Sequence, residues 1–403
     1  MSNNSDFQIE DGVLIEYTGK DKDVVIPDSV TSIGENAFYW CGSLTSIIIP
    51  DSMTSIGDSA FYECKSLTSI TIPDSVTSIG RYAFYGCTSL TSITIPDSVT
   101  SIGYEAFCGC KSLTSITIPD GVTSIGHCAF YGCKSLTSIT IPNSVISIGY
   151  NAFCGCKSLT SIIITDLKAW LEIDFGNYWS DSRYNFFLRN NKITKLTIPD
   201  DVTSIGNGAF SDCKSLTSIT IPDSVTSIGK DAFGGCESLT SITIPDSVIS
   251  IGERAFEDCT SLTSIKIAAS NEKYLIINNY DKVERDIVAA TEVFRTRKLD
   301  SEVKIPLDLK IQLAVKLIDW YDNAEAKAYV KKMLTRGMKA LIDSGNLELI
   351  QVLLEKTDFV TKRNVDKYIQ YAIDTKQQEI YLTLIHYKDE IGAYTEISKK
   401  FRL

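Results

Sequence analysis

The chain has 403 residues, of which 44% are hydrophobic and 22% are charged. This composition is typical of a folded protein and excludes an intrinsically disordered chain. The net charge is −11, and residues 1–267 alone hold 16 Lys and Arg against 29 Asp and Glu. Because such an acidic segment repels a phosphate backbone, we expect no nucleic-acid partner.

The first residues show neither an export signal nor a membrane anchor. The opening MSNNSDFQIEDG lacks the basic start and the apolar stretch that a signal peptide requires. No run approaches the ~18 apolar residues of a membrane-spanning helix. We therefore predict no transmembrane segment and a cytoplasmic location by default. The cell surface or secretion is the alternative, in case a leader was removed.

Residues 1–23 are predicted to form an N-terminal hairpin cap. The segment Phe7–Tyr17 reads FQIEDGVLIEY, with Asp11-Gly12 at its centre. This dipeptide between apolar residues is a strong signal for a β-hairpin. Such a hairpin would shield the first unit of the repeat that follows.

Residues 24–267 are dominated by a 23-residue repeat, which predicts a solenoid. One unit reads LTSITIPDSVTSIGRYAFYGCTS, from Leu67 to Ser89. Its start has the L-x-x-L-x-L form of a leucine-rich repeat, in which a short strand points Ile70 and Ile72 inward. One unit buries too little apolar surface to offset the entropy of ordering it, so the units must stack. Proline marks the period at Pro27, Pro50, Pro73, Pro96, Pro119, Pro142, Pro199, Pro222 and Pro245.

Two further features of the unit recur. Thr77–Ile79 is predicted to form a second extended piece on the opposite wall, and the Ala-Phe-x-x-Cys stretch after it a short helical turn. Gly80 and its equivalents indicate either a backbone with positive φ or a close approach between units.

Nine of the 12 cysteines share one position of the repeat. We interpret them as small buried apolar residues in a reducing compartment. Disulfides between stacked units are a weaker alternative, because side chains in a stacked column point the same way. A metal site is another, because no histidine stands nearby to complete it. We predict no metal and no cofactor.

The repeat FYGCKSLTSITIPDSVTSIG resembles the BspA-like leucine-rich repeat family. The resemblance covers residues 24–267 and extends over the cap from residue 7. It implies a β-rich solenoid of stacked coils with short parallel strands and no catalytic residues. Exported members of this family bind host matrix proteins or other cells, which implies a host matrix protein or a glycan as partner if this chain is exported.

The repeat is interrupted at about residues 165–195, where the proline step grows from 23 to 34 residues. Two interpretations stay open. The aromatic residues of the inserted segment either pack inside an enlarged coil or form an exposed binding patch. The candidates for partner contact in this segment are Trp170, Tyr178, Trp179 and Tyr184.

Residues 268–403 are predicted to form an all-α module of helical hairpins. Asp281–Phe294 places apolar residues on one helix face. Pro306 suits the start of a second helix. The segments Ala340–Glu355 and Tyr371–His386 align at an offset of 31 residues and weakly resemble degenerate ankyrin-type hairpins.

No residue set in the sequence suits catalysis. The two histidines, His127 and His386, lie in an exposed variable slot and in a helical pattern, without partners at a useful spacing. No phosphate-binding glycine motif occurs. We predict that the chain is not an enzyme.

We expect the chain to be a protein-protein interaction scaffold whose partner the sequence does not identify. A surface adhesin and a self-associating structural protein are the alternatives. One variable position of the repeat carries tyrosine in four units, which would form a rigid aromatic stripe if the rings point outward. These partner-binding candidates are Tyr39, Tyr62, Tyr85 and Tyr131.

Overall fold

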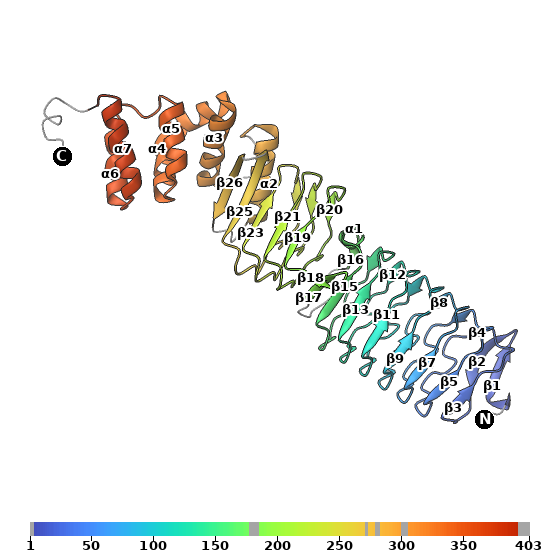
Figure 1. Cartoon of the computed structure of the whole chain (residues 1–403). Coiled ribbons are helices and arrows are strands. Elements are labelled where there is room, and N and C mark those ends of the chain that lie inside the picture. The colour runs from blue at the N-terminus through green and yellow to red at the C-terminus, as the bar shows by residue number, and fades with distance from the viewer. Residues whose placement is uncertain (1–3, 177–184, 271–272, 279–282, 300–304, 394–403) are drawn as a thin grey trace. The chain divides into compact units, whose positions relative to one another are not determined.

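The computed structural model of the chain describes residues 4–176, 185–270, 273–278, 283–299 and 305–393. The chain folds as two compact units (Figure 1). The first comprises Met1–Ile242 and Ser250–Thr263, and the second comprises Thr243–Ile249 and Ser264–Leu403.

The first unit begins with the predicted hairpin cap. After a short 3-10 helix (Asn4–Asp6), β1 (Phe7–Glu10) pairs antiparallel with β2 (Val13–Tyr17). Asp11 and Gly12 have φ angles of 49° and 79°, the left-handed pair that a tight hairpin needs. The chain thus forms a β-hairpin at this place, and β2 in turn pairs in parallel with the first coil of the solenoid.

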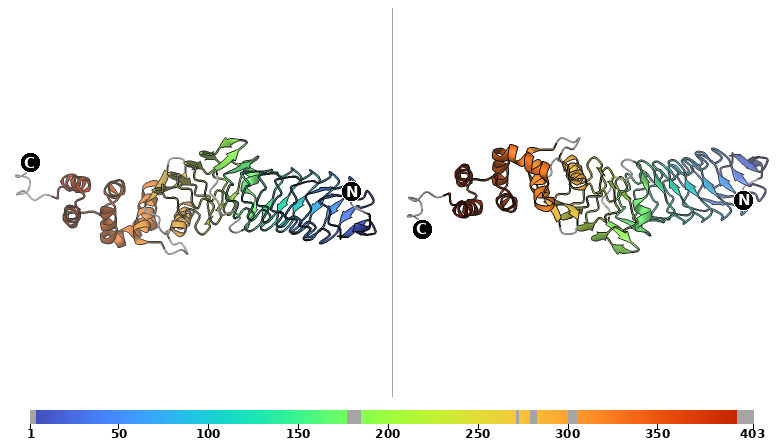
Figure 2. Two further views of the ribbon diagram at one scale, coloured as in Figure 1. Left: turned by 90° about the horizontal axis from the view of Figure 1, so that it is seen from below. Right: turned by 90° about the horizontal axis from the view of Figure 1, so that it is seen from above.

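The solenoid coils carry two walls of short parallel strands, as predicted (Figures 1 and 2). Equivalent residues of successive coils pair, for example Ser92 with Ser115 on one wall and Ser101 with Ser124 on the other. Along β9, for example, Ile93 points into the coil and Ser92 and Thr94 point outward. The first wall holds β3 (Asp23–Val25), β5 (Ser46–Ile48), β7 (Ser69–Thr71), β9 (Ser92–Thr94), β11 (Ser115–Thr117), β13 (Ser138–Ile141) and β15 (Ser161–Ile164). The second wall holds β4 (Ser32–Ile33), β6 (Ser55–Ile56), β8 (Ser78–Ile79), β10 (Ser101–Ile102), β12 (Ser124–Ile125) and β14 (Ser147–Ile148).

The third wall consists of turns where a helical turn was expected. Alternate backbone N–H groups donate to the next coil, as from Phe84 to the Ala106 carbonyl at 2.8 Å, and the others close turns within the coil, as from Tyr85 to the Tyr82 carbonyl at 3.0 Å. One fully buried phenylalanine per coil fills the core behind this wall. The rings stack along the solenoid, with neighbouring centroids 5.1 Å apart for Phe38 and Phe61 and 5.4 Å apart for Phe107 and Phe130.

The recurring cysteine also joins neighbouring coils. The Cys110 thiol donates to the Phe84 carbonyl oxygen at 3.2 Å, and Cys133 repeats the contact with Phe107. The cysteines are therefore buried hydrogen-bond donors as well as small apolar residues. The recurring glycine is explained by close approach, since a Cβ at Gly80 would lie 2.6 Å from the Asp58 nitrogen.

The insertion enlarges one coil without breaking the core. A short helix, α1 (Leu167–Leu171), leads to β16 (Asp174–Phe175), which pairs with β14 on the second wall. On the first wall β17 (Asn185–Leu188) pairs with β15, and β18 (Asn191–Lys192) turns back along it. The coils then resume with β19 (Lys195–Thr197), β20 (Ser204–Ile205), β21 (Ser218–Thr220), β22 (Ser227–Ile228), β23 (Ser241–Ile244) and β24 (Ser250–Ile251).

The second unit begins with a β-hairpin that the sequence analysis did not anticipate. β25 (Ser264–Ser270) pairs antiparallel with β26 (Lys273–Asn278), so the expected boundary at residue 268 falls inside a strand. Alternating apolar residues such as Ile265 and Ile267, both fully buried, explain this extension of the β structure.

The helices that follow agree with the predicted pattern (Figures 1 and 2). Pro306 precedes the helix it was expected to start, and the buried Leu313 and Leu317 lie on that helix. The two segments related by 31 residues each span a helix–turn–helix connection, α4 to α5 and α6 to α7. The helices are α2 (Val283–Thr296), α3 (Leu307–Tyr321), α4 (Ala324–Asp343), α5 (Leu347–Lys356), α6 (Val365–Asp374) and α7 (Gln378–Glu390).

Candidate partner-binding surface

The turn wall of the first unit carries the side chains that differ most between coils. We call the first, second and fifth residues after the recurring glycine the outer positions. In the coil that contains Gly80 they are Arg81, Tyr82 and Tyr85. They lie outside the phenylalanine stack because the intervening Ala83 and Phe84 point inward and are fully buried.

Three predicted site residues form one continuous tyrosine stack. Tyr39 and Tyr62 lie 4.9 Å apart between ring centroids, and Tyr62 and Tyr85 lie 4.7 Å apart with nearly parallel planes. Tyr39 is 48% exposed, and the other two rings are partly exposed. The rigid spacing of the coils fixes these rings, so a partner that contacts them orders little in doing so.

Further rings and cations surround the tyrosine stack. Tyr82 meets Tyr62 and Tyr85 edge-on at 6.5 and 6.1 Å, and it contacts Tyr104 of the next coil at 5.2 Å. The Arg81 guanidinium lies 5.3 Å from the centre of the Tyr104 ring. At this edge of the stack, the Tyr104 ring therefore already contacts a positively charged group, the Arg81 guanidinium.

The surroundings of the stack are acidic. Burial, followed by neighbouring groups that include Glu63 and Glu105, raises the pKa of both Tyr62 and Tyr85. A hydrogen bond with Glu105 and the charge of that carboxylate raise the pKa of Tyr104 to about 12. The rings therefore stay neutral at physiological pH, beside carboxylates.

An open groove of about 760 Å³ lies at the N-terminal end of the tyrosine stack. Rings of the stack and residues of the cap strand β2 face one another across it. Its lining is Ile15, Glu16, Tyr17, Asn36, Ala37, Tyr39, Ser59, Tyr62 and Tyr82.

The fourth predicted tyrosine stands apart. Tyr131 is 45% exposed and occupies the same outer position as Tyr85. Cys108 fills that position in the intervening coil, so the stack ends at Tyr85 and Tyr131 lies beyond it.

The prediction of an exposed patch in the insertion is wrong for Trp170. Its side chain is only 1% exposed, packs against Phe175 and Phe186, and donates from Nε1 to the Ala209 carbonyl oxygen at 2.8 Å. The indole fills the core between two coils, in line with the interpretation of aromatic residues packed inside. The other three candidates, Tyr178, Trp179 and Tyr184, lie outside the described residues.

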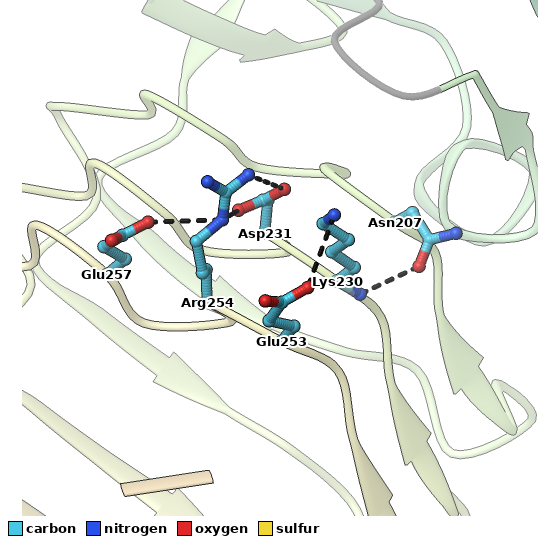
Figure 3. A network of polar contacts seen from close by, with 6 residues as sticks. All are labelled: Asn207, Lys230, Asp231, Glu253, Arg254 and Glu257. Atoms are coloured by element: carbon cyan, nitrogen blue, oxygen red, sulfur yellow. Dashed lines mark hydrogen bonds and ion pairs between the residues drawn. The ribbon is translucent and has the colours of Figure 1, made fainter. Parts of the chain in front are cut away.

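After the insertion, the outer positions carry paired charged residues instead of aromatic ones. Arg254 binds Asp231 through two bonds, Nε to Oδ1 at 3.0 Å and Nη2 to Oδ2 at 3.2 Å (Figure 3). Its Nε also lies 3.3 Å from Glu257, and Lys230 lies 3.5 Å from Glu253. Ion pairs between coils thus stand where the earlier coils carry rings.

The sequence analysis missed several aromatic residues of the same surface. Tyr82 and Tyr104 belong to the stack's surroundings, and Trp40 and Tyr150 are 58% and 44% exposed. For Tyr82, Tyr104 and Tyr150 the signal was the pair of residues after each recurring glycine, which was interpreted only as a variable slot. Trp40 stands outside that pair, directly after Tyr39.

The described histidine and cysteine side chains, which are the residue types suited to catalysis, make contacts within the chain or are buried. The His127 ring accepts a hydrogen bond from the Tyr150 backbone N–H at 3.0 Å, and the exposed His386 lies 3.2 Å from Glu390. Burial raises the pKa of Cys87 to about 12 and that of Cys110 far above its usual range. Among the residues that the structure describes, no three His, Cys, Asp or Glu side chains cluster as metal ligands, and no helix could span a membrane.

Several solved structures similar to this chain are bacterial leucine-rich repeat proteins. The protein of T. pallidum is 29% identical, with a TM-score of 0.40, over 53% of this chain and 90% of its own. A protein of Bacteroides ovatus is 31% identical, with a TM-score of 0.37, over 66% and 87%. A leucine-rich cell surface protein of Faecalibacterium prausnitzii is 28% identical, with a TM-score of 0.31, over 67% and 93%.

No curated protein matches the chain. The model of the BspA type leucine rich repeat region matches residues 14–111, 77–173 and 182–280, which together cover more than half of the sequence. Proteins of this class generally act as scaffolds for protein interaction and are typically not enzymes. The chain belongs to the BspA-type leucine-rich repeat family.

Proposed function

We propose that this chain is a non-enzymatic scaffold that binds a protein partner through the tyrosine stack. The observation that carries the proposal is the stack itself, in which three partly exposed rings lie 4.7 to 4.9 Å apart on a stiff wall. Tyrosine is enriched among the residues that dominate protein interfaces, because it combines a large apolar area with a polar tip. A rigid ring also loses little entropy on binding.

The lack of catalysis is part of the proposal. Burial raises the pKa of Cys110 and of Cys133 well above the usual range, and so disfavours the thiolate that a nucleophile needs. His127 uses its ring nitrogen for a backbone N–H of the next coil. Both observations support a structural use of these side chains.

A reducing compartment, such as the cytoplasm, is the location we propose. Seven of the nine recurring cysteines donate from the thiol to a phenylalanine carbonyl oxygen, as Cys64 does to Phe38 at 3.1 Å. Oxidation would remove this donor, so the contact is made best by reduced cysteine. Surface display with a host matrix protein as partner is tested by the same experiment.

The test compares two variants of the full chain with the parent protein. The first replaces Tyr39, Tyr62 and Tyr85 by Ala. The matched control replaces three exposed threonines of the first strand wall, Thr71, Thr94 and Thr117, by Ala. Each protein is offered a lysate of the source cells and a panel of extracellular matrix proteins, in reducing buffer.

We expect a partner that the parent and the threonine variant hold equally and that the tyrosine variant loses by more than about 10-fold in affinity, which is typical of interface hot spots. A matrix protein with this pattern would favour the surface role. A partner that the tyrosine variant retains would contradict the proposal. Binding lost only in the threonine variant would move the site to the strand wall.

A further inference from the structure

The groove beside the tyrosine stack exists because two outer positions carry short side chains. The second outer positions of the first two coils hold Asn36 and Ser59, whereas the third coil holds Tyr82. The rings of Tyr39 and Tyr62 therefore border an unfilled space instead of a neighbouring ring. Strand β2 of the cap closes the other side, and the groove holds about 760 Å³, enough for one large side chain and part of its backbone.

The Tyr39 ring is half-exposed at this end of the stack and lines the groove. Tyr39 is the first ring, with Tyr62 stacked on one side at 4.9 Å, and it remains 48% exposed. Glu16 of β2 lines the same groove and is exposed. Within the described part of the chain no ion pair neutralises Glu16. The groove thus combines an exposed ring with an available carboxylate.

We propose that this groove is a pocket for a positively charged side chain, best an arginine, on the protein partner of the solenoid. The guanidinium group lies against the exposed part of the Tyr39 ring, and its N–H groups donate to the Glu16 carboxylate. A planar guanidinium stacks on a ring and offers several donors at once, which a lysine ammonium does not. The inference rests on the proposed function, because it describes the chemistry of the partner at the same surface.

The chain itself shows that rings of this surface hold cations. Arg81 lies 5.3 Å from the centre of Tyr104 and 5.9 Å from that of Tyr82. Lys65 lies 5.0 Å from the centre of Trp40. Two of the chain's own cations thus occupy ring faces of the same wall, and the exposed part of the Tyr39 ring lacks such an occupant.

The charge of the surroundings favours a cationic partner over a neutral sugar. The first outer positions of the first two coils are Glu35 and Asp58, both exposed. Residues 1–267 carry a net charge of −13, since 16 basic residues face 29 acidic ones. This field steers positive segments toward the groove and adds to the contact with Glu16.

The test measures binding of a hexa-arginine peptide to the full chain by titration calorimetry in 50 and 150 mM salt. A hexa-citrulline peptide has the same shape without the charge, and maltohexaose represents a neutral sugar. The variants are Glu16→Gln and Tyr39→Leu. Asp97→Asn is the matched control, because it removes one exposed carboxylate far from the groove.

We expect hexa-arginine to bind and hexa-citrulline and maltohexaose not to bind. Glu16→Gln and Tyr39→Leu should each weaken binding by about 2- to 5-fold, as for exposed ion pairs and cation–π contacts. Asp97→Asn should leave the affinity unchanged. Thermal unfolding checks that both variants are folded, and two variants on different elements keep the test informative if one is not.

Four results would overturn the inference. Hexa-citrulline binding as well as hexa-arginine would exclude a charge-selective pocket. An equal loss in Asp97→Asn would show attraction to the overall charge only. Binding of maltohexaose alone would assign the groove to sugars. If the captured partner is lost in the triple tyrosine variant but unaffected by Glu16→Gln, this inference fails while the proposed function stands.

Discussion

The coils before and after the insertion share a core and differ at the surface. Phe84 before it and Phe233 after it are both fully buried in the same place of the repeat. At the outer positions, however, the earlier coils carry the tyrosine stack, whereas the later coils carry ion pairs such as Arg254 with Asp231 (Figure 3). The repeat therefore fixes the scaffold and leaves the outer positions to vary.

The two surfaces differ in what a partner can gain from them. At the outer positions of the later coils, Lys230, Asp231 and Arg254 already have charged partners within the chain, so a ligand must break those contacts to use them. The rings of the earlier coils stack on each other from coil to coil and stay partly exposed to solvent. Covering apolar ring area displaces water without breaking an internal bond. This contrast is why we place recognition on the earlier coils.

The largest effect is expected where the two regions are alike. Phe84→Ala and Phe233→Ala should each cost about 3–5 kcal/mol, because each leaves a cavity in the ring stack of the core. Urea unfolding of the two variants measures these costs. Closely similar losses would confirm a common core, whereas a loss confined to one variant would show that the regions differ in packing as well as in surface.

A smaller effect is expected at the junction between the regions. Trp170→Phe removes the indole N–H that donates to the Ala209 carbonyl at 2.8 Å. Leaving that buried oxygen without its donor should cost about 1–3 kcal/mol. Trp40→Phe is the control, because Trp40 is 58% exposed and should change the unfolding midpoint little. Equal costs would contradict the structural role of the buried indole.

Much of the fold is predictable because the period of the repeat can be read directly from the sequence. The proline spacing, the alternation around Ile70 and the Asp11-Gly12 turn each follow from local stereochemistry, and the structure confirms them. The β-hairpin formed by β25 and β26 was harder to predict. Ser264–Ser270 continues the sequence of a coil strand, and only its pairing with the following strand, Lys273–Asn278, shows that a β-hairpin precedes the helices.

The site was predictable in part, and for a physical reason. A tyrosine every 23 residues must form a column in a stacked solenoid, which gives Tyr39, Tyr62 and Tyr85. Whether an aromatic residue of the insertion points inward depends on the space that neighbouring coils leave, as for Trp170. The groove was not predictable, because it arises from short residues at Asn36 and Ser59 facing a cap strand.

The tyrosine stack should stabilise the earlier coils without dependence on salt. Tyr62 contacts Tyr39 and Tyr85, and an aromatic pair contributes about 0.5–1.5 kcal/mol beyond its buried area. We therefore expect Tyr62→Leu to lower the free energy of unfolding by about 1 kcal/mol, equally in 0.1 and 1 M salt. Tyr131→Leu, outside the stack, should have a smaller effect. A loss at Tyr62 that fades in high salt would point to charges instead.

The ion pairs of the later coils should contribute least and should depend on salt. The side chains of Arg254 and Asp231 are 34% and 28% exposed, so water and ions screen their attraction. We expect Asp231→Asn to cost less than about 1 kcal/mol in 0.1 M salt and to cost nothing measurable in 1 M salt. Asp223→Asn, in an exposed turn, is the control. A loss above that size, unchanged by salt, would mean that the paired charges hold the later coils together as the rings do the earlier ones.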